Sequence, residues 1–79
     1  MLSEQQQHAI VEMGKDTDTP FTQAKTQNVY RNRSSFWRAM QYLKGVNIVE
    51  PKRNGYTLTI RGLTFAVLLS EIRKYDEKR

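Results

Sequence analysis

The side chains best suited to chemistry recur at helical spacing in one stretch in the middle of the chain. Ser34, Arg38 and Gln41 follow one another at intervals of four and three residues, which places them on one side of a helix. Trp37 and Tyr42 flank this polar strip on its two sides. Hydroxyl, guanidinium and amide groups on one helix face are the groups that read base edges. The stretch therefore predicts a helix that binds nucleic acid.

The residue types that catalysis needs are missing or scattered. The chain has no cysteine and a single histidine, His8, which excludes thiolate metal sites and leaves the imidazole without partner ligands. No carboxylate pair, serine–histidine arrangement or phosphate-cradling glycine loop is present, because the four glycines are isolated from one another. We therefore expect no enzyme activity, no cofactor and no metal.

The positive charge is concentrated around the polar strip. Residues 25–61 contain eight cationic residues and one acidic residue, a net charge of +7, within a chain whose net charge is +5. Residues 1–24 carry −3 and residues 62–79 carry +1. A basic segment with interleaved aromatic residues indicates a polyanionic partner. The alternative is a solvated basic face that has no partner.

At 79 residues the chain is long enough for one domain, 1–79. A domain of this size buries only about 60% of its unfolded surface, so its core must be small and efficient. The longest apolar run, Phe65 to Leu69, is far shorter than the ~20 residues of a membrane span, and no signal-peptide pattern is present. We expect an intracellular protein, cytoplasmic or nucleoid-associated, with no membrane contact.

Capping residues and apolar spacing predict two helices before the polar strip. Ser3 and Gln6 form a capping box that begins a helix over 3–13, and Gly14 can end it. Thr19 and Pro20 are a cap and a first helical residue. They predict a short helix over 20–27 with Phe21 and Ala24 facing inward.

The stretch that carries the polar strip is predicted to be a helix over 33–46. Its buried face is Phe36, Ala39, Met40 and Leu43, its cap is Asn32 or Ser34, and Asn47 ends it in a left-handed conformation.

A hairpin over 48–60 follows, because Asn54-Gly55 favours a type I′ turn and the residues after it alternate as a strand does. A last helix over 60–76, with Thr59 as its cap, completes the chain.

The last helix is apolar on two arcs, which is more than a small monomer normally covers. One arc is Leu63, Ala66 and Val67, which we expect to pack on the domain. The other arc is the expected homodimer interface: Phe65, Leu68, Leu69, Ile72 and Tyr75. The alternative is a helix that its own domain covers on both arcs.

The order of these elements and several motif residues resemble winged helix-turn-helix DNA-binding domains of the MarR, ArsR and PadR regulator types. The resemblance runs through Asn32-Arg33-Ser34-Ser35-Phe36-Trp37-Arg38-Ala39-Met40, then Leu43 and Asn47 to Glu50, and then Tyr56, Leu58, Thr59 and Gly62. It implies an α+β, mostly α fold with a three-helix core, a two-stranded wing and a C-terminal helix. The connection from Ala24 to Asn32 is longer than the joint usual in that family.

The resemblance makes 33–46 the recognition helix of the major groove and 48–60 the wing. It implies DNA contacts from Arg31, Asn32, Arg33, Ser34, Ser35, Trp37, Arg38, Gln41, Lys44, Lys52, Arg53 and Asn54. Arg38 and Gln41 are the expected base readers, because guanidinium suits guanine and the amide suits adenine. Trp37 is expected either to pack on a sugar or thymine methyl group or to be an aromatic at the edge of the core.

Among the remaining basic residues, Lys44 is a weaker phosphate candidate, and Arg31 and Arg61 flank the same region. Tyr42 is expected to pack on a neighbouring helix. The wing tip would contact phosphates or the minor groove.

Three functions are compatible with this sequence. The first is a sequence-specific, double-stranded-DNA-binding transcription regulator that acts as a homodimer. The second is a winged helix used as a protein-interaction module, since a fold does not fix a function. The third is RNA binding or non-specific, architectural nucleic-acid binding. No small-molecule ligand is implied, because the chain lacks the extra sequence of effector-binding regulators.

Overall fold

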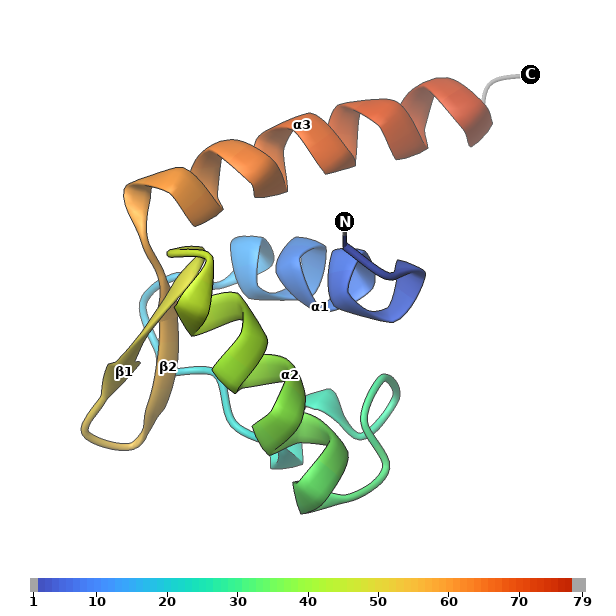
Figure 1. Ribbon diagram of the computed structural model, residues 1–79. Helices are drawn as coiled ribbons and strands as arrows, with labels where there is room; N and C mark the ends of the chain where they lie inside the picture. The colour runs from blue at the N-terminus through green and yellow to red at the C-terminus, as the bar shows by residue number, and fades with distance from the viewer. Residues whose placement is uncertain (1, 78–79) are drawn as a thin grey trace.

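A computed structural model describes residues 2–77 and shows an α+β, mostly helical domain with three helices and one antiparallel hairpin (Figure 1). A 3-10 helix, η1, lies between the first two helices. In chain order the elements are α1 (Glu4–Lys15), η1 (Ala24–Thr26), α2 (Arg33–Gly45), β1 (Val49–Lys52), β2 (Gly55–Leu58) and α3 (Ile60–Glu77). None of the helices in residues 2–77 is long and apolar enough to cross a membrane.

Helix α3 lies along α1, and α2 extends from this pair toward the opposite side of the molecule (Figure 1). The capping box of Ser3 and Gln6 begins α1 as predicted. The helix does not end at Gly14 but continues to Lys15. Gly14 instead permits close packing of α1 against α3, because a Cβ at Gly14 would lie 2.8 Å from the Cβ of Ala66 on α3.

The core sits where α1, α2 and the start of the hairpin meet. The face of α2 that the sequence predicted to be buried is buried, and Phe36 lies at the centre of an aromatic cluster. Its ring centroid is 6.3 Å from Phe21, 6.1 Å from Tyr30 and 6.0 Å from Tyr56. Burial raises the pKa of the Tyr30 hydroxyl. Because Phe36 is on α2 and Tyr56 is on β2, this cluster fixes the helix against the hairpin.

The predicted helix over 20–27 is wrong. Phe21 is extended and forms an isolated bridge to Tyr56, with its N–H donating to the Tyr56 carbonyl at 2.7 Å. Only Ala24–Thr26 is helical, and Ala24 is exposed rather than buried. The Thr26 hydroxyl donates to main-chain carbonyls of Thr22 and Gln23, at 3.2 and 3.1 Å. Main-chain bonds to the hairpin keep Phe21 out of a helix, and within 20–27 main-chain bonds of the helical kind remain only from Lys25 to Thr22 and from Thr26 to Gln23, at 3.1 and 3.0 Å.

Local signals at the ends of α2 act as predicted. The Asn32 side chain accepts a hydrogen bond from the Ser35 N–H at 2.8 Å, which makes Asn32 the cap. Asn47 has a φ of 63°, in the left-handed region, and the chain turns directly into β1. The length and direction of α2 are therefore set by residues at its own ends.

The hairpin pairs Val49 with Leu58 and Lys52 with Gly55, so its two turn residues are Arg53 and Asn54. The predicted type I′ turn is wrong, because neither turn residue has a positive φ. Gly55 has a φ of 154°, and a Cβ there would lie 2.5 Å from the Phe21 carbonyl oxygen. The glycine is needed where the extended Phe21 segment approaches the hairpin.

Thr59 joins the hairpin to α3, and replacing it with valine is expected to lower the free energy of unfolding by about 1–2 kcal/mol. Its Oγ1 accepts from the Gly62 N–H at 3.0 Å and donates to the Asn47 carbonyl at 2.6 Å. Valine has nearly the same shape as threonine but can make neither of these hydrogen bonds. Urea unfolding measures the change. Thr57→Val is the control, and an equal loss in both variants would contradict this role for Thr59.

Candidate nucleic-acid interface

Two of the three residues of the polar strip, Ser34 and Arg38, are exposed on the surface of α2 as the spacing predicted, whereas Gln41 is half-buried. The face that carries Phe36 and Leu43 is buried, so the residues on the opposite side point outward. Arg33, Ser34, Trp37 and Arg38 are all exposed and together line a shallow hollow of about 510 Å³ on the helix surface. A guanidinium pair, a hydroxyl and an indole therefore share one accessible patch.

The arginines of this region are free to bind an external anion. Among the described side chains, those of residues 2–75, Arg31, Arg33, Arg38 and Arg53 form no ion pair. The first turn of α2 contains no acidic residue, so the partial positive charge of the helix N-terminus adds to that of Arg31 and Arg33. Positive charge gathered at one helix end attracts anions such as phosphate.

Trp37 is exposed, with 59% of its surface accessible to solvent. It is absent from the aromatic cluster around Phe36, although it is the next residue in the chain. The structure therefore does not place Trp37 at the edge of the core, which was one of the two expectations; the expected contact with a sugar or a thymine methyl group stays a prediction.

Tyr42 lies on the other flank of α2 and is partly exposed. It lines a groove of about 440 Å³ in which Phe65 and Leu69 come from α3. Tyr42 is 41% exposed, so the expected packing on a neighbouring helix is limited to this shared groove.

Gln41 is half-buried and connects α2 to the hairpin. Its Nε2 donates to the hydroxyl of Tyr56 on β2, at 3.4 Å. Tyr56 also packs against Phe36, so it joins the hairpin both to the core and to the polar strip. Tyr56 was expected only as a residue of the hairpin, without a contact to the polar strip. The long-range partner of Gln41 was not visible in the local pattern.

The hairpin tip presents a second group of polar residues. Arg53 and Asn54 are exposed in the turn. Lys52 is beside them, but its Nζ lies 3.4 Å from a carboxylate oxygen of Glu50, and both side chains are half exposed. The Glu50 charge partly neutralises Lys52, so Arg53 is the stronger anion-binding group of the tip.

The hairpin tip and the first turns of α2 both lie on the side of the molecule away from α3 (Figure 1). This side contains most of the residues that the sequence analysis selected, namely Arg31, Asn32, Arg33, Ser34, Ser35, Trp37, Arg38, Lys52, Arg53 and Asn54. Lys44 is not among them, because it lies in the last turn of α2. Arg61 is also apart, since its guanidinium carbon lies 5.8 Å above the Phe65 ring on α3.

The buried and exposed side chains of α3 do not follow the two apolar arcs that the sequence predicted. Phe65 and Leu69 are half-buried and pack against the core of their own domain. Leu68, Ile72 and Tyr75 remain exposed.

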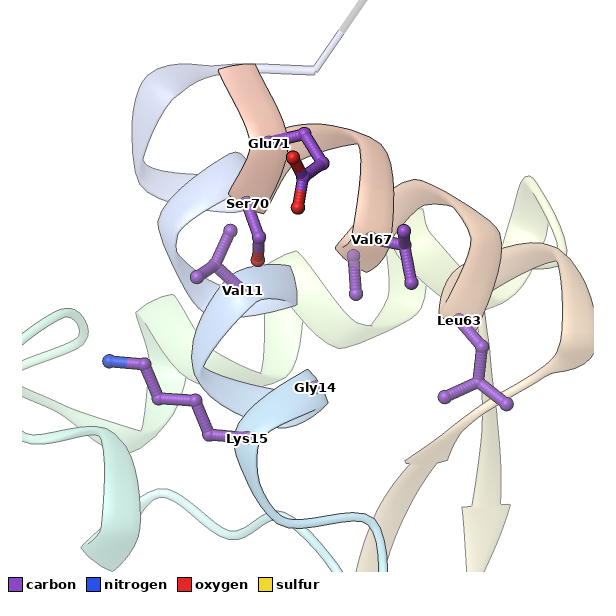
Figure 2. Close-up of a pocket in the computed structure, with 8 residues that line it drawn as sticks. Val11, Gly14, Lys15, Leu63, Val67, Ser70 and Glu71 are labelled. Carbon is purple, nitrogen blue, oxygen red and sulfur yellow. The ribbon is translucent and has the colours of Figure 1, made fainter. Parts of the chain in front are cut away.

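On the other side of α3, Ala66 is buried whereas Leu63 and Val67 are exposed. The side chains of Leu63 and Val67 line a groove of about 240 Å³ with Val11 of α1 (Figure 2). Neither arc is fully covered by the domain.

Comparisons of the chain with known protein families, with curated proteins and with solved structures find no match. The candidate interface combines free arginines, hydroxyl and amide groups, and one exposed indole. The side away from α3 is the part of residues 2–77 best suited to a polyanion.

Proposed function

We propose that this protein is a sequence-specific, double-stranded-DNA-binding protein of the winged helix-turn-helix class, acting as a transcription regulator. In this proposal α2 is the recognition helix in the major groove, and the hairpin is the wing beside it. The observation that carries the proposal is the exposed Arg33 and Arg38, which pair with no acidic side chain of residues 2–75, beside Ser34 and Trp37 on the outward face of a capped helix. Arg53 at the hairpin tip supplies a second point of contact.

The dimensions of α2 support this use. Thirteen residues give a helix about 20 Å long, which fits a major groove about 12 Å wide. The wing tip would then reach the flanking backbone or minor groove. The aromatic cluster and the Gln41–Tyr56 contact hold the wing at a fixed place beside the helix.

A second copy of the chain is the partner proposed for α3. Leu68, Ile72 and Tyr75 are separated by four and three residues, which is the spacing of a helix-pairing seam. All three side chains are exposed, whereas Phe65 packs against the core of its own domain. A homodimer formed here would present two α2 helices to two half-sites, and half-sites about 34 Å apart would fit one turn of DNA.

Selection of duplexes from a random pool, followed by binding measurements at several salt concentrations, tests the proposal. The selected duplex is expected to bind more tightly than a random duplex or a single strand. Four phosphate contacts would make log affinity fall with log salt at a slope of about −3.6. A palindromic selected site together with a dimer in sedimentation equilibrium is the expected result.

Other outcomes identify the other functions. Equal affinity for selected and random duplexes would overturn sequence specificity in favour of architectural binding. Tighter binding to single strands or RNA would overturn the duplex assignment. Weak, salt-independent DNA binding would contradict the proposal and favour a protein-interaction module, for which the exposed apolar side chains of α3 would be the contact surface.

A further inference from the structure

Trp37 is an apolar side chain in polar surroundings. Arg33 and Ser34 lie four and three residues before it, and Gln41 lies four residues after it, so all three neighbour the indole on the helix surface. Arg38 follows it directly in the chain. In the described part of the chain no aromatic ring or guanidinium stacks on the indole. Packing in the core therefore does not explain why an indole is present at this position. Because it lies on the proposed recognition surface, we look for an apolar group on the DNA that it could contact.

The major groove offers few apolar groups to such a side chain. Base edges there present hydrogen-bond acceptors and donors, and the apolar group among them is the C5 methyl of thymine. Trp37 and Arg38 are consecutive, so their positions on the helix differ by about 100° and about 1.5 Å of rise. Base pairs are about 3.4 Å apart along the DNA axis, so the two side chains can reach adjacent steps.

We propose that Trp37 is a specificity-determining residue that selects thymine by packing its indole on the C5 methyl group, next to a guanine contacted by Arg38. The inference rests on the proposed function of α2 as a recognition helix. It deepens that function by naming a base and the atom of the base that is read. The indole contributes shape and apolar contact, and Arg38 contributes hydrogen bonds to the neighbouring base.

Replacing each thymine of the selected duplex by deoxyuridine tests the proposal in the wild-type protein. This exchange removes one methyl group and leaves every hydrogen-bonding group of the base pair in place. At one position in each half-site, the exchange is expected to weaken binding about fourfold, the loss typical of one buried methyl group. At the other thymines we expect little change.

The variant Trp37→Ala completes the test as a double-mutant cycle. We expect it to bind the thymine and deoxyuridine duplexes equally well, because the group that senses the methyl is gone. Tyr42→Ala is the matched control, since it removes an aromatic from the opposite flank of α2 and should retain the fourfold difference. Circular dichroism should show the same fold for both variants.

Each possible result decides the proposal. If specific duplex binding is found but no thymine is sensitive to loss of its methyl group, then Trp37 packs on sugar or has another role, and the inference is overturned while the proposed function stands. An unchanged thymine preference in Trp37→Ala would overturn it in the same way. Failure to bind any duplex would overturn both.

Discussion

Replacing Arg38 by alanine is expected to weaken binding to the selected duplex by about 10- to 100-fold and to relax discrimination at one base pair. Arg38 is exposed, lies on the side of α2 away from the core, and has no ion pair with the described side chains of residues 2–75. Its guanidinium is therefore available for two parallel hydrogen bonds to a guanine. Fluorescence anisotropy with the selected duplex and its point variants measures both effects.

Two further variants separate base reading from charge. Arg38→Lys keeps the cation but loses the paired geometry, so it should retain the salt dependence while losing most of the discrimination. Lys74→Ala removes one exposed cation from α3, where it pairs with Glu71, and should leave affinity nearly unchanged. If Arg38→Ala discriminated among duplexes as well as wild type, α2 would not be the recognition helix in the orientation proposed.

Replacing Gly62 by alanine is expected to lower the free energy of unfolding by about 3 kcal/mol. Gly62 is in the first turn of α3, where a Cβ would collide with the main-chain carbonyl of Ile48 and would lie 2.9 Å from the Leu58 Cδ2. The Ile48 carbonyl already accepts the Thr59 N–H at 3.0 Å, so it cannot move without loss of that bond. Urea unfolding followed by circular dichroism gives the value.

Gly45→Ala is the matched control, because a Cβ at Gly45 meets no atom within 4 Å. Gly45 is the last residue of α2, so alanine there is expected to be neutral or to stabilise by about 0.5–1 kcal/mol. The two substitutions are chemically the same and should have opposite signs. Equal effects would show that helix propensity, rather than contact between α3 and the hairpin, decides the outcome at Gly62.

The sequence by itself determined the elements whose signals are local. Asn32 caps α2 with its own side chain, and Asn47 ends the helix by adopting a left-handed conformation. The buried face of α2 follows from apolar residues spaced three and four apart, and the polar strip opposite it follows from the same geometry. Such interactions join residues close together in the chain, so the sequence of one short segment is enough to predict them.

The tertiary structure alone decided where distant segments meet. Phe21 is extended rather than helical because its main-chain bonds go to Tyr56, which lies 35 residues further along the chain. For the same reason Gln41 bonds to the hairpin, and Gly14 packs against α3 instead of ending α1. The aromatic cluster formed without Trp37, which left the indole exposed at 59%. These outcomes depend on packing between elements, and periodicity within one element does not specify which neighbour will cover it.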